Sequence, residues 1–220
     1  MGRSKERKEV SELSNQVPKA VISRLSLYLR ELQRIQRTGQ ETVSSTQLGK
    51  FLGFTDAQVR KDLAYFGQFG YPGIGYRCDE LIQAIREILG TSQPWHIALI
   101  GLGNLGRALL GYRGFPTQGF SIVAAFDIDE SVIGSEIEGV PVHHLDQLKA
   151  VVTQEQIRLA MLAVPAQAAQ AVTRQIIEAG IDGILNFAPV TVTMPENVSV
   201  VGVDLAIELE QLTFSVLRQR

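Results

Sequence analysis

One short segment in the middle of the chain has the glycine spacing of a turn that binds dinucleotide phosphates: Gly101-Leu102-Gly103-Asn104-Leu105-Gly106. An apolar run over 96–100 precedes it and a helical pattern over 104–110 follows it, as a strand–turn–helix unit requires. Asp127 lies about 20 residues further on, where a carboxylate accepts hydrogen bonds from ribose hydroxyls. These residues predict a dinucleotide site.

Acidic residues continue beyond this position, at Asp129 and Glu130. Because they would repel the 2′-phosphate of NADP, the pattern favours NAD. The alternative interpretation is that Asp127 merely ends the strand predicted over 121–126.

A second candidate site lies in the N-terminal half. A short helix from Ser45 to Gly53 and a helix over 56–66, for which Thr55 and Gln58 predict a capping box, have helix-turn-helix spacing. Arg60 can form a bidentate contact to guanine, and Lys61 places a point charge near phosphate. The alternative is a solvated helix face.

Glycines interleave with aromatic residues over 67–76, which predicts a short β-hairpin after this helix. The N-terminal elements together indicate a winged helix that binds double-stranded DNA. The candidate DNA-binding residues are Ser45, Gln58, Arg60, Lys61, Phe66, Gly73 and Tyr76.

Charge is distributed unevenly over the 220 residues, although the net charge is only −2. Residues 1–90 contain 14 basic and 10 acidic side chains, whereas residues 91–220 contain 7 and 13. This asymmetry is typical of a chain in which one half faces phosphate, although a basic tail on an ordinary enzyme would also produce it. We predict four segments: a disordered basic tail (1–16), a winged helix (17–90), a dinucleotide-binding domain (91–203) and a C-terminal helix (204–220).

Hydrophobic patterning predicts an α/β fold whose second domain is a doubly wound parallel sheet. Its further strands are expected over 140–143, 158–164 and 183–186, with a helix over 167–179. A long amphipathic helix is expected to begin at Pro18 and end near Gly39. The absence of an 18-residue apolar run and of a signal peptide favours a soluble, cytoplasmic protein without membrane contact. Cys78 is the only cysteine, which excludes a multi-cysteine metal site, and we predict no metal.

The C-terminal segment carries an apolar stripe at helical spacing, made of Leu205, Leu209, Leu212 and Val216. Either its own domain or a second subunit must cover this stripe. A winged helix that binds a palindromic site is normally a dimer, which favours the second subunit.

Motifs in both halves resemble those of Rex, a family of bacterial redox-sensing repressors. They are Val17-Pro18, Ser23-Arg24-Leu25, Tyr28-Leu29-Arg30, Val59-Arg60-Lys61-Asp62-Leu63, Tyr65-Phe66-Gly67, Gly73-Ile74-Gly75-Tyr76, the segment 101–106, Phe126-Asp127-Ile128-Asp129 and Gly183-Ile184-Leu185-Asn186-Phe187-Ala188-Pro189. The resemblance implies a homodimer with exchanged C-terminal helices, bound to palindromic operators upstream of fermentation and respiration genes. It also implies that NADH releases the protein from DNA, whereas NAD⁺ competes for the site and permits DNA binding.

Three switch residues follow from the same resemblance. Tyr112 matches the tyrosine near the nicotinamide, Asp204 the aspartate at the base of the exchanged helix, and Arg30 the arginine that pairs with it in the DNA-binding state. Pro72 departs from the family, whose wing has a basic residue at this position. Operator binding is therefore expected to depend more on Arg60 and Lys61.

A carboxylate near the nicotinamide can distinguish its two redox states, since only the oxidised ring is positively charged. At about 5 Å and an effective dielectric of about 20, the Coulomb energy is roughly 3 kcal/mol. We hypothesise that Asp204 is this carboxylate and that its choice between Arg30 and Tyr112 reports the redox state. The alternative is that Asp204 only caps the last helix.

The competing class of protein is an NAD-dependent oxidoreductase with an accessory N-terminal domain. Such an enzyme needs a group that moves a proton as the hydride moves. Lys149 is the only lysine after residue 90, and neither His96 nor the pair His143-His144 has an evident carboxylate partner. No substrate domain is apparent, so we predict no catalytic residue.

Overall fold

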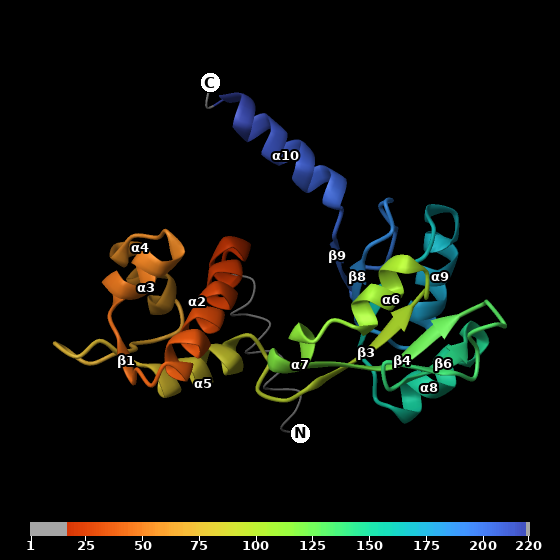
Figure 1. The fold of residues 1–220 in the computed structure, drawn as a ribbon, viewed down its shortest axis with the longest axis horizontal. Helices are drawn as coiled ribbons and strands as arrows, with labels where there is room; N and C mark the ends of the chain where they lie inside the picture. Colours follow the sequence, from red (N-terminus) through yellow and green to blue (C-terminus); the bar gives the residue numbers. More distant parts are fainter. Residues whose placement is uncertain (1–16, 219–220) are drawn as a thin grey trace. The chain divides into compact units, whose positions relative to one another are not determined.

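A computed structural model describes residues 17–218, which divide into two compact units between Gln93 and Pro94 (Figure 1). The predicted disordered tail, residues 1–16, lies outside the described residues. The described part of unit 1, residues 17–93, contains α2 (Lys19–Arg37), β1 (Thr42–Val43), α3 (Ser45–Leu52), α4 (Asp56–Ala64), β2 (Tyr76–Arg77) and α5 (Cys78–Ile88).

Helix α2 forms the centre of unit 1. The helix predicted to begin at Pro18 and end near Gly39 is present, with Pro18 at its N-cap and Thr38 at its C-cap. Its apolar face packs against α3, α4 and α5 in one core. The buried residues on this face are Val21, Leu25, Tyr28, Leu29, Leu32 and Ile35, whereas the neighbouring Ile22 is exposed.

A buried carboxylate, Asp62 of α4, connects α4 to α2. Arg24 donates to it from Nε at 2.5 Å and from Nη2 at 2.8 Å, and the Tyr28 hydroxyl donates at 2.8 Å. The Gln58 amide, on α4 itself, donates to Oδ1 at 2.7 Å. Burial by itself would raise the pKa of Asp62, but these hydrogen bonds outweigh it and hold the pKa below its ordinary value. The ionised group therefore fixes how α4 packs on α2.

The caps of α3 and α4 differ from the prediction. Ser44 and Gln47 form a complete capping box before α3, with hydrogen bonds in both directions. Thr55 does accept from the Gln58 N–H, but the Gln58 side chain turns to Asp62, so the box predicted at α4 is only half formed. The buried carboxylate is a better partner for that amide than an exposed N–H group.

The predicted hairpin is also only partly formed. Tyr71 and Gly75 make a single antiparallel bridge around the tip 72–74, whereas β2 pairs with β1. A methyl group on Gly75 would lie 2.6 Å from the Val43 carbonyl oxygen, so this glycine permits the close approach to β1. Repeated glycines over 67–75 bend the backbone too sharply for two long paired strands.

Unit 2 contains a seven-stranded sheet in the order β5-β6-β4-β3-β7-β8-β9, parallel except at β5–β6. The predicted strands are present as β3 (Trp95–Ile100), β4 (Phe120–Asp127), β6 (Val140–His144), β7 (Leu159–Leu162) and β8 (Gly183–Asn186). The sequence interpretation missed β5 (Glu136–Ile137) and the exposed edge strand β9 (Ser199–Gly202). The helices are α6 (Asn104–Leu110), α7 (Gly114–Thr117), α8 (Leu148–Gln154), α9 (Ala166–Glu178) and α10 (Leu205–Arg218), with a 3₁₀ turn η1 (Leu145–Gln147).

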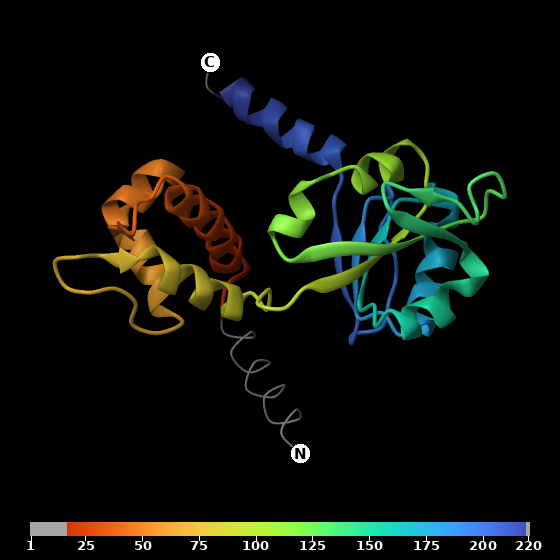
Figure 2. The ribbon, with the colours of Figure 1, turned by 60° about the horizontal axis from the view of Figure 1, so that its bottom comes forward.

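Alternating side chains of the sheet enter two cores on its opposite faces (Figure 2). Ala98 and Ile100 of β3 pack with α8 and α9, whereas Ile97 and Leu99 pack on the side of α6. Helices on both faces of a mostly parallel sheet define the doubly wound α/β fold, which confirms the predicted fold class.

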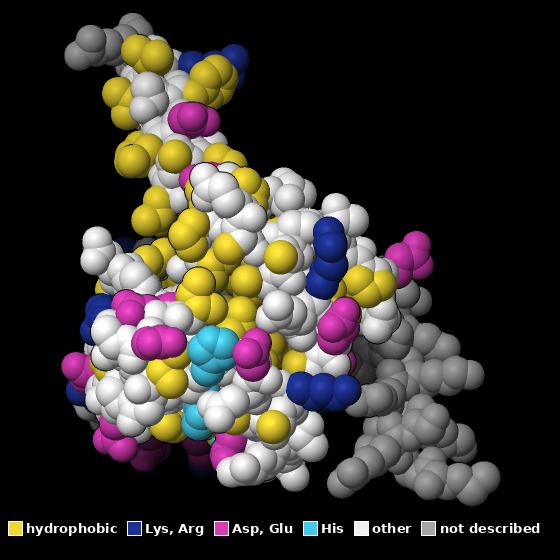
Figure 3. Space-filling model, turned by 90° about the vertical axis from the view of Figure 1, so that its right-hand side faces the viewer, with side chains coloured by type: hydrophobic (Ala, Val, Ile, Leu, Met, Phe, Trp, Pro, Cys, Tyr) yellow, Lys and Arg dark blue, Asp and Glu magenta, His cyan; other side chains and the backbone are white. Residues whose placement is uncertain are grey.

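Helix α10 buries none of its side chains in its own chain. Hydrophobic groups are visible along it in Figure 3. The large apolar residues exposed on this helix are Leu205, Ile207, Leu209, Leu212, Phe214, Val216 and Leu217. Within 17–218, no helix combines the length and apolar character needed to cross a membrane.

We expect Asp62→Asn to lower the free energy of unfolding by about 3 kcal/mol, because it removes the counter-charge of the partly buried Arg24. Denaturant unfolding at neutral pH measures the loss. Asp79→Asn is the control, because Asp79 is more than half exposed in its ion pair with Arg77, so this substitution should cost far less. Equal losses in the two variants would contradict the role of Asp62.

The Asp62 contribution should also depend on pH. Because folding lowers its pKa, the stabilisation is present above about pH 4, the unfolded value, and disappears as pH falls through the folded value. The difference in stability between parent and Asp62→Asn should therefore shrink on acidification.

Candidate functional site

The turn after β3 depends on its glycines. Gly101 has φ of +96°, and a methyl group there would lie 2.5 Å from the Ala163 carbonyl oxygen. A methyl group on Gly106 would overlap the Gly101 carbonyl oxygen, whereas one on Gly103 would meet nothing within 4 Å. Gly101 and Gly106 therefore close the turn, and Gly103 leaves open space beside the backbone, as a bound diphosphate requires.

A cavity of about 610 Å³ lies over this turn, at the carboxyl ends of the central strands. Strands β4 and β7 flank β3 on its two sides, and the connecting helices lie on opposite faces of the sheet. Ligands of open α/β sheets bind at this position. Residues lining it include Gly101, Leu102, Gly103, Asn104, Leu105, Arg107, Asp127, Ile128, Asp129, Ala163 and Phe187.

Asp127 holds the turn as well as lining the cavity. Its Oδ2 accepts from the Leu102 N–H at 2.6 Å, and its Oδ1 accepts from the N–H groups of Ile128 at 2.7 Å and Asp129 at 3.1 Å. A carboxylate offers about four acceptor positions, so capacity remains for a ribose hydroxyl. The alternative interpretation, that Asp127 merely ends a strand, leaves out its hydrogen bond to the glycine-rich turn.

Two further charged residues, Asp129 and Arg107, line the same cavity. Hydrogen bonds from Ser131, and more weakly the nearby Arg107, hold the pKa of Asp129 below its ordinary value, so this carboxylate is ionised at neutral pH. Arg107 donates from Nε to the Leu102 carbonyl oxygen at 3.1 Å. Sequence reasoning missed Arg107, although its place directly after Gly106 was the available signal, since the first helical turn faces the phosphates.

Of the three predicted switch residues, Arg30 belongs to unit 1, whereas Tyr112 and Asp204 belong to unit 2. Tyr112 is 57% exposed and packs edge-on against Phe115, with ring centroids 4.8 Å apart. Asp204 accepts from the Ala206 N–H at 2.9 Å and so caps α10. Arg30 is exposed on unit 1. Neither Tyr112 nor Asp204 lines the cavity over the glycine-rich turn.

A second cavity, of about 430 Å³, lies where β8, β9 and α10 meet. Asp204 and Ile207 of the α10 segment line it together with residues that follow β8. The candidate redox carboxylate thus belongs to this second cavity.

The candidate DNA contacts gather on α3 and α4. Arg60 is exposed, pairs with Asp56 at 2.8 Å and donates to the Ser45 hydroxyl at 3.1 Å. Lys61 is exposed beside it. Both basic side chains therefore lie on the surface of the second helix of a helix-turn-helix, where a DNA-reading helix carries its contacts.

The other predicted DNA contacts differ in accessibility. Gly73 lies at the exposed tip of the hairpin with φ of +78°. Gln58 is engaged with Asp62, and Phe66 packs against the core of unit 1. Tyr76 is only 8% exposed, so its ring serves the core and offers DNA little surface.

Two histidines of unit 2 make local contacts. In residues 17–218, no three His, Cys, Asp or Glu side chains are grouped so as to hold a metal ion. His96 Nδ1 lies 2.7 Å from the Glu155 carbonyl oxygen, and the His144 ring caps η1. Both histidines therefore make structural contacts.

Fold and site together define a DNA-binding protein with a dinucleotide-binding domain. Comparison with family models agrees, since residues 16–64 match the "Putative DNA-binding protein N-terminus" and residues 92–190 match the "CoA binding domain".

Relatives identify the family. The chain is 46% identical to the redox-sensing transcriptional repressor Rex of Desulforamulus reducens, over 91% of this chain and 95% of that protein. It is equally similar to Rex of Carboxydothermus hydrogenoformans, over 92% and 97%. The chain therefore belongs to the Rex family of redox-sensing transcriptional repressors, which confirms the resemblance and decides against the oxidoreductase.

Solved structures agree with this assignment. The structure of RSP, a Rex-family repressor, in complex with β-NAD⁺ and operator DNA matches with a TM-score of 0.86 and 32% identity, covering 92% of this chain and 94% of that one. RSP in complex with β-NADH matches with a TM-score of 0.82 and 30% identity, covering 93% and 96%.

We expect Gly103→Ala to weaken NADH binding at least about tenfold, because the methyl group occupies the space left for the diphosphate. Its melting temperature should stay within about 2 °C of the parent, since the methyl group meets no protein atom. Calorimetric titration and thermal unfolding measure the two quantities.

Gly106→Ala provides the contrast. Its methyl group overlaps the Gly101 backbone, so this variant should lose stability together with binding. Unchanged NADH affinity in Gly103→Ala would place the diphosphate elsewhere.

Proposed function

We propose that this protein represses transcription in the cytoplasm by binding palindromic operators, and that NADH bound to unit 2 releases it. The observation that carries the proposal is the glycine-rich turn with its open space at Gly103, facing a cavity large enough for a dinucleotide. The RSP complexes with β-NAD⁺ and operator DNA and with β-NADH support the same ligands here.

The proposed ligand pair is NADH and NAD⁺, with NADP(H) disfavoured. Asp127 and Asp129 both line the cavity next to the exposed side chain of Ile128, which offers an apolar surface to an adenine ring. Two carboxylates at the ribose end disfavour the negatively charged 2′-phosphate of NADP(H).

The proposed DNA contacts come from α3, the exposed face of α4 and the hairpin tip. Arg60 would exchange its ion pair with Asp56 for a base or phosphate contact, and this exchange costs little because both partners are about half exposed. Lys61 would contact phosphate. Because Pro72 supplies no charge at the tip of the hairpin, most of the affinity for operator DNA is proposed to come from α4.

The proposed assembly is a homodimer that exchanges α10 between subunits. The support is the set of large apolar side chains that α10 leaves exposed, together with the marginal stability of an isolated helix of this length in water. In such a dimer, Asp204 at the base of α10 would approach the partner subunit. There it is proposed to interact with either Arg30 or Tyr112, depending on the redox state of the nucleotide.

Operator binding titrated with NADH, NAD⁺ and NADPH tests the function. A fluorescent palindromic duplex selected from a library is bound at one fixed salt concentration, because affinity for DNA falls steeply with salt. We expect NADH to release the duplex, NAD⁺ to leave it bound, and NADPH to require far higher concentrations. Retention of the duplex at saturating NADH would refute the proposed function.

Asp204→Ala tests the proposed switch in the same assay. The variant should still bind NADH, because Asp204 lies outside the nucleotide cavity, yet fail to release the operator. Release at the parent NADH concentration would leave Asp204 as a helix cap only.

Leu212→Glu tests the dimer. A charge on the apolar face of α10 should convert the dimer to monomer at micromolar concentration in sedimentation experiments. Gln211→Glu is the matched control, because it adds the same charge on the polar side of the helix, in line with Glu208 and Ser215. A dimer in both variants would show that α10 is not the interface.

A further inference from the structure

The segment that follows β8 forms part of the wall of the nucleotide cavity and of the second cavity, at the base of α10. Phe187 lines the nucleotide cavity, whereas the next three residues, Ala188, Pro189 and Val190, line the cavity at the base of α10. We call residues 187–190 the shared wall. A single peptide bond joins Phe187 to Ala188, so a displacement of Phe187 acts directly on the wall of the second cavity.

Asn186 holds the shared wall at both ends. This residue is only 5% exposed, and its Oδ1 accepts from the Ala188 N–H at 2.9 Å. Its Nδ2 donates to the Val190 carbonyl oxygen at 2.8 Å. The side chain thus keeps the wall in one compact turn, with both ends of its amide satisfied.

The backbone of Asn186 reaches the start of α10 as well. Its carbonyl oxygen accepts from the Val203 N–H at 2.8 Å, and Val203 directly precedes Asp204. One buried residue therefore directly precedes Phe187 of the nucleotide cavity and is hydrogen-bonded to the wall of the second cavity and to the chain that enters α10.

We propose that Asn186 is a positioning residue that couples the nucleotide cavity to α10 through the shared wall. The inference rests on the proposed function, because it explains how occupancy of one cavity changes the position of Asp204 and Ile207 in the other. A short turn held at both ends moves as a unit, so contact with Phe187 shifts Ala188 and Val190 together. Coupling of this kind requires a segment with two arrangements that both sites favour differently.

A purely structural role for Asn186 makes a different prediction. A residue that only completes the end of β8 would change stability and leave the effect of NADH on operator affinity intact. The distinguishing quantity is the coupling factor, which is the operator dissociation constant at saturating NADH divided by that without nucleotide.

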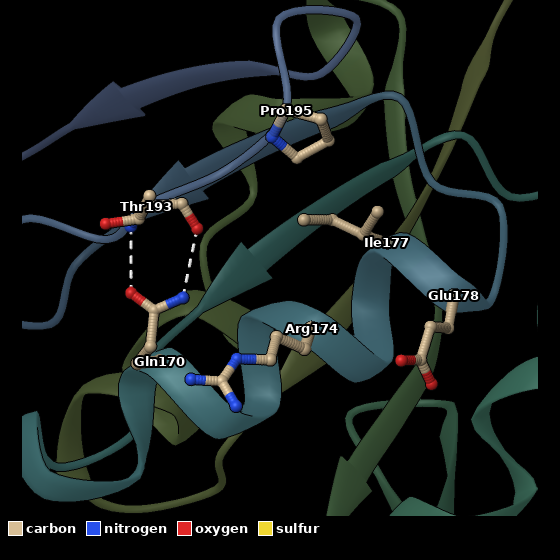
Figure 4. Close-up of a pocket in the computed structure, with 6 residues that line it drawn as sticks. All are labelled: Gln170, Arg174, Ile177, Glu178, Thr193 and Pro195. Atoms are coloured by element: carbon tan, nitrogen blue, oxygen red, sulfur yellow. Dashed lines mark hydrogen bonds between the residues drawn. The ribbon is translucent and has the colours of Figure 1, made fainter.

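A matched control lies further along the same loop. Gln170 of α9 holds Thr193 by the same pair of amide bonds, donating from Nε2 to its carbonyl oxygen at 3.0 Å and accepting from its N–H at 2.8 Å (Figure 4). Gln170 lines a separate hollow with Arg174, Ile177 and Pro195, outside both cavities. Gln170→Glu therefore loosens the loop without touching the shared wall.

The test measures the coupling factor in the parent, Asn186→Asp and Gln170→Glu at one salt concentration. Asn186→Asp keeps the acceptor for Ala188 but replaces the donor to Val190 with a negative charge. We expect its coupling factor to fall to nearly one, while its NADH dissociation constant without DNA stays within about threefold of the parent. Gln170→Glu should keep the parent coupling factor. Asn186→Ser, which retains an acceptor for Ala188, replaces Asn186→Asp if thermal unfolding shows that the charge prevents folding.

Two results would overturn the inference while leaving the proposed function intact. They are a parent-like coupling factor in a folded Asn186 variant, or an equal loss in Gln170→Glu, which would assign the effect to the loop as a whole. A coupling factor of one in the parent itself would instead overturn the proposed function and this inference with it.

Discussion

The apolar surface of α10 constrains any account of this protein. Its fourteen residues lie at the end of a complete α/β unit, yet none of their side chains is buried in the described chain. Tertiary packing of an apolar face supplies most of the stability of a helix in water, so this one needs a partner surface. In the proposed dimer the partner subunit covers α10, and Asp204 therefore lies within reach of side chains of that subunit. Nucleotide binding, dimer geometry and DNA binding then depend on the same helix.

Carboxylates with several donors position both functional surfaces. Asp62 is buried, and its three side-chain donors fix α4, which presents Arg60 to solvent. Asp127 is only partly buried and accepts three backbone N–H groups, which shape the turn over the nucleotide cavity. An ionised group that accepts several hydrogen bonds is costly to displace, so each carboxylate provides rigidity at a point where a ligand must find a preformed surface.

The sequence predicted the elements whose signals are local and strong. Five parallel strands, the glycine-rich turn and the helix-turn-helix were found because apolar periodicity and turn residues mark them directly. Strand β9 was missed because all of its residues are exposed. The short hairpin predicted over 67–76 is only partly formed, because β2 pairs with β1, which lies far from it in the sequence. The contacts of Asp62 with Arg24 and Tyr28 join residues far apart in the chain, which no single-sequence pattern encodes. The roles of Tyr112 and Asp204 stay predictions, since neither residue lines the nucleotide cavity of this chain.

Linkage between the two ligands is the property on which this account depends, and it is reciprocal. If NADH lowers affinity for the operator, the operator must lower affinity for NADH by the same factor. Calorimetric titration of the unmodified protein with NADH, alone and then saturated with its operator duplex, measures that factor from the nucleotide side. We predict that the NADH dissociation constant of the operator-bound protein is roughly 5- to 150-fold larger than that of the free protein. Equal constants in the two titrations would contradict it.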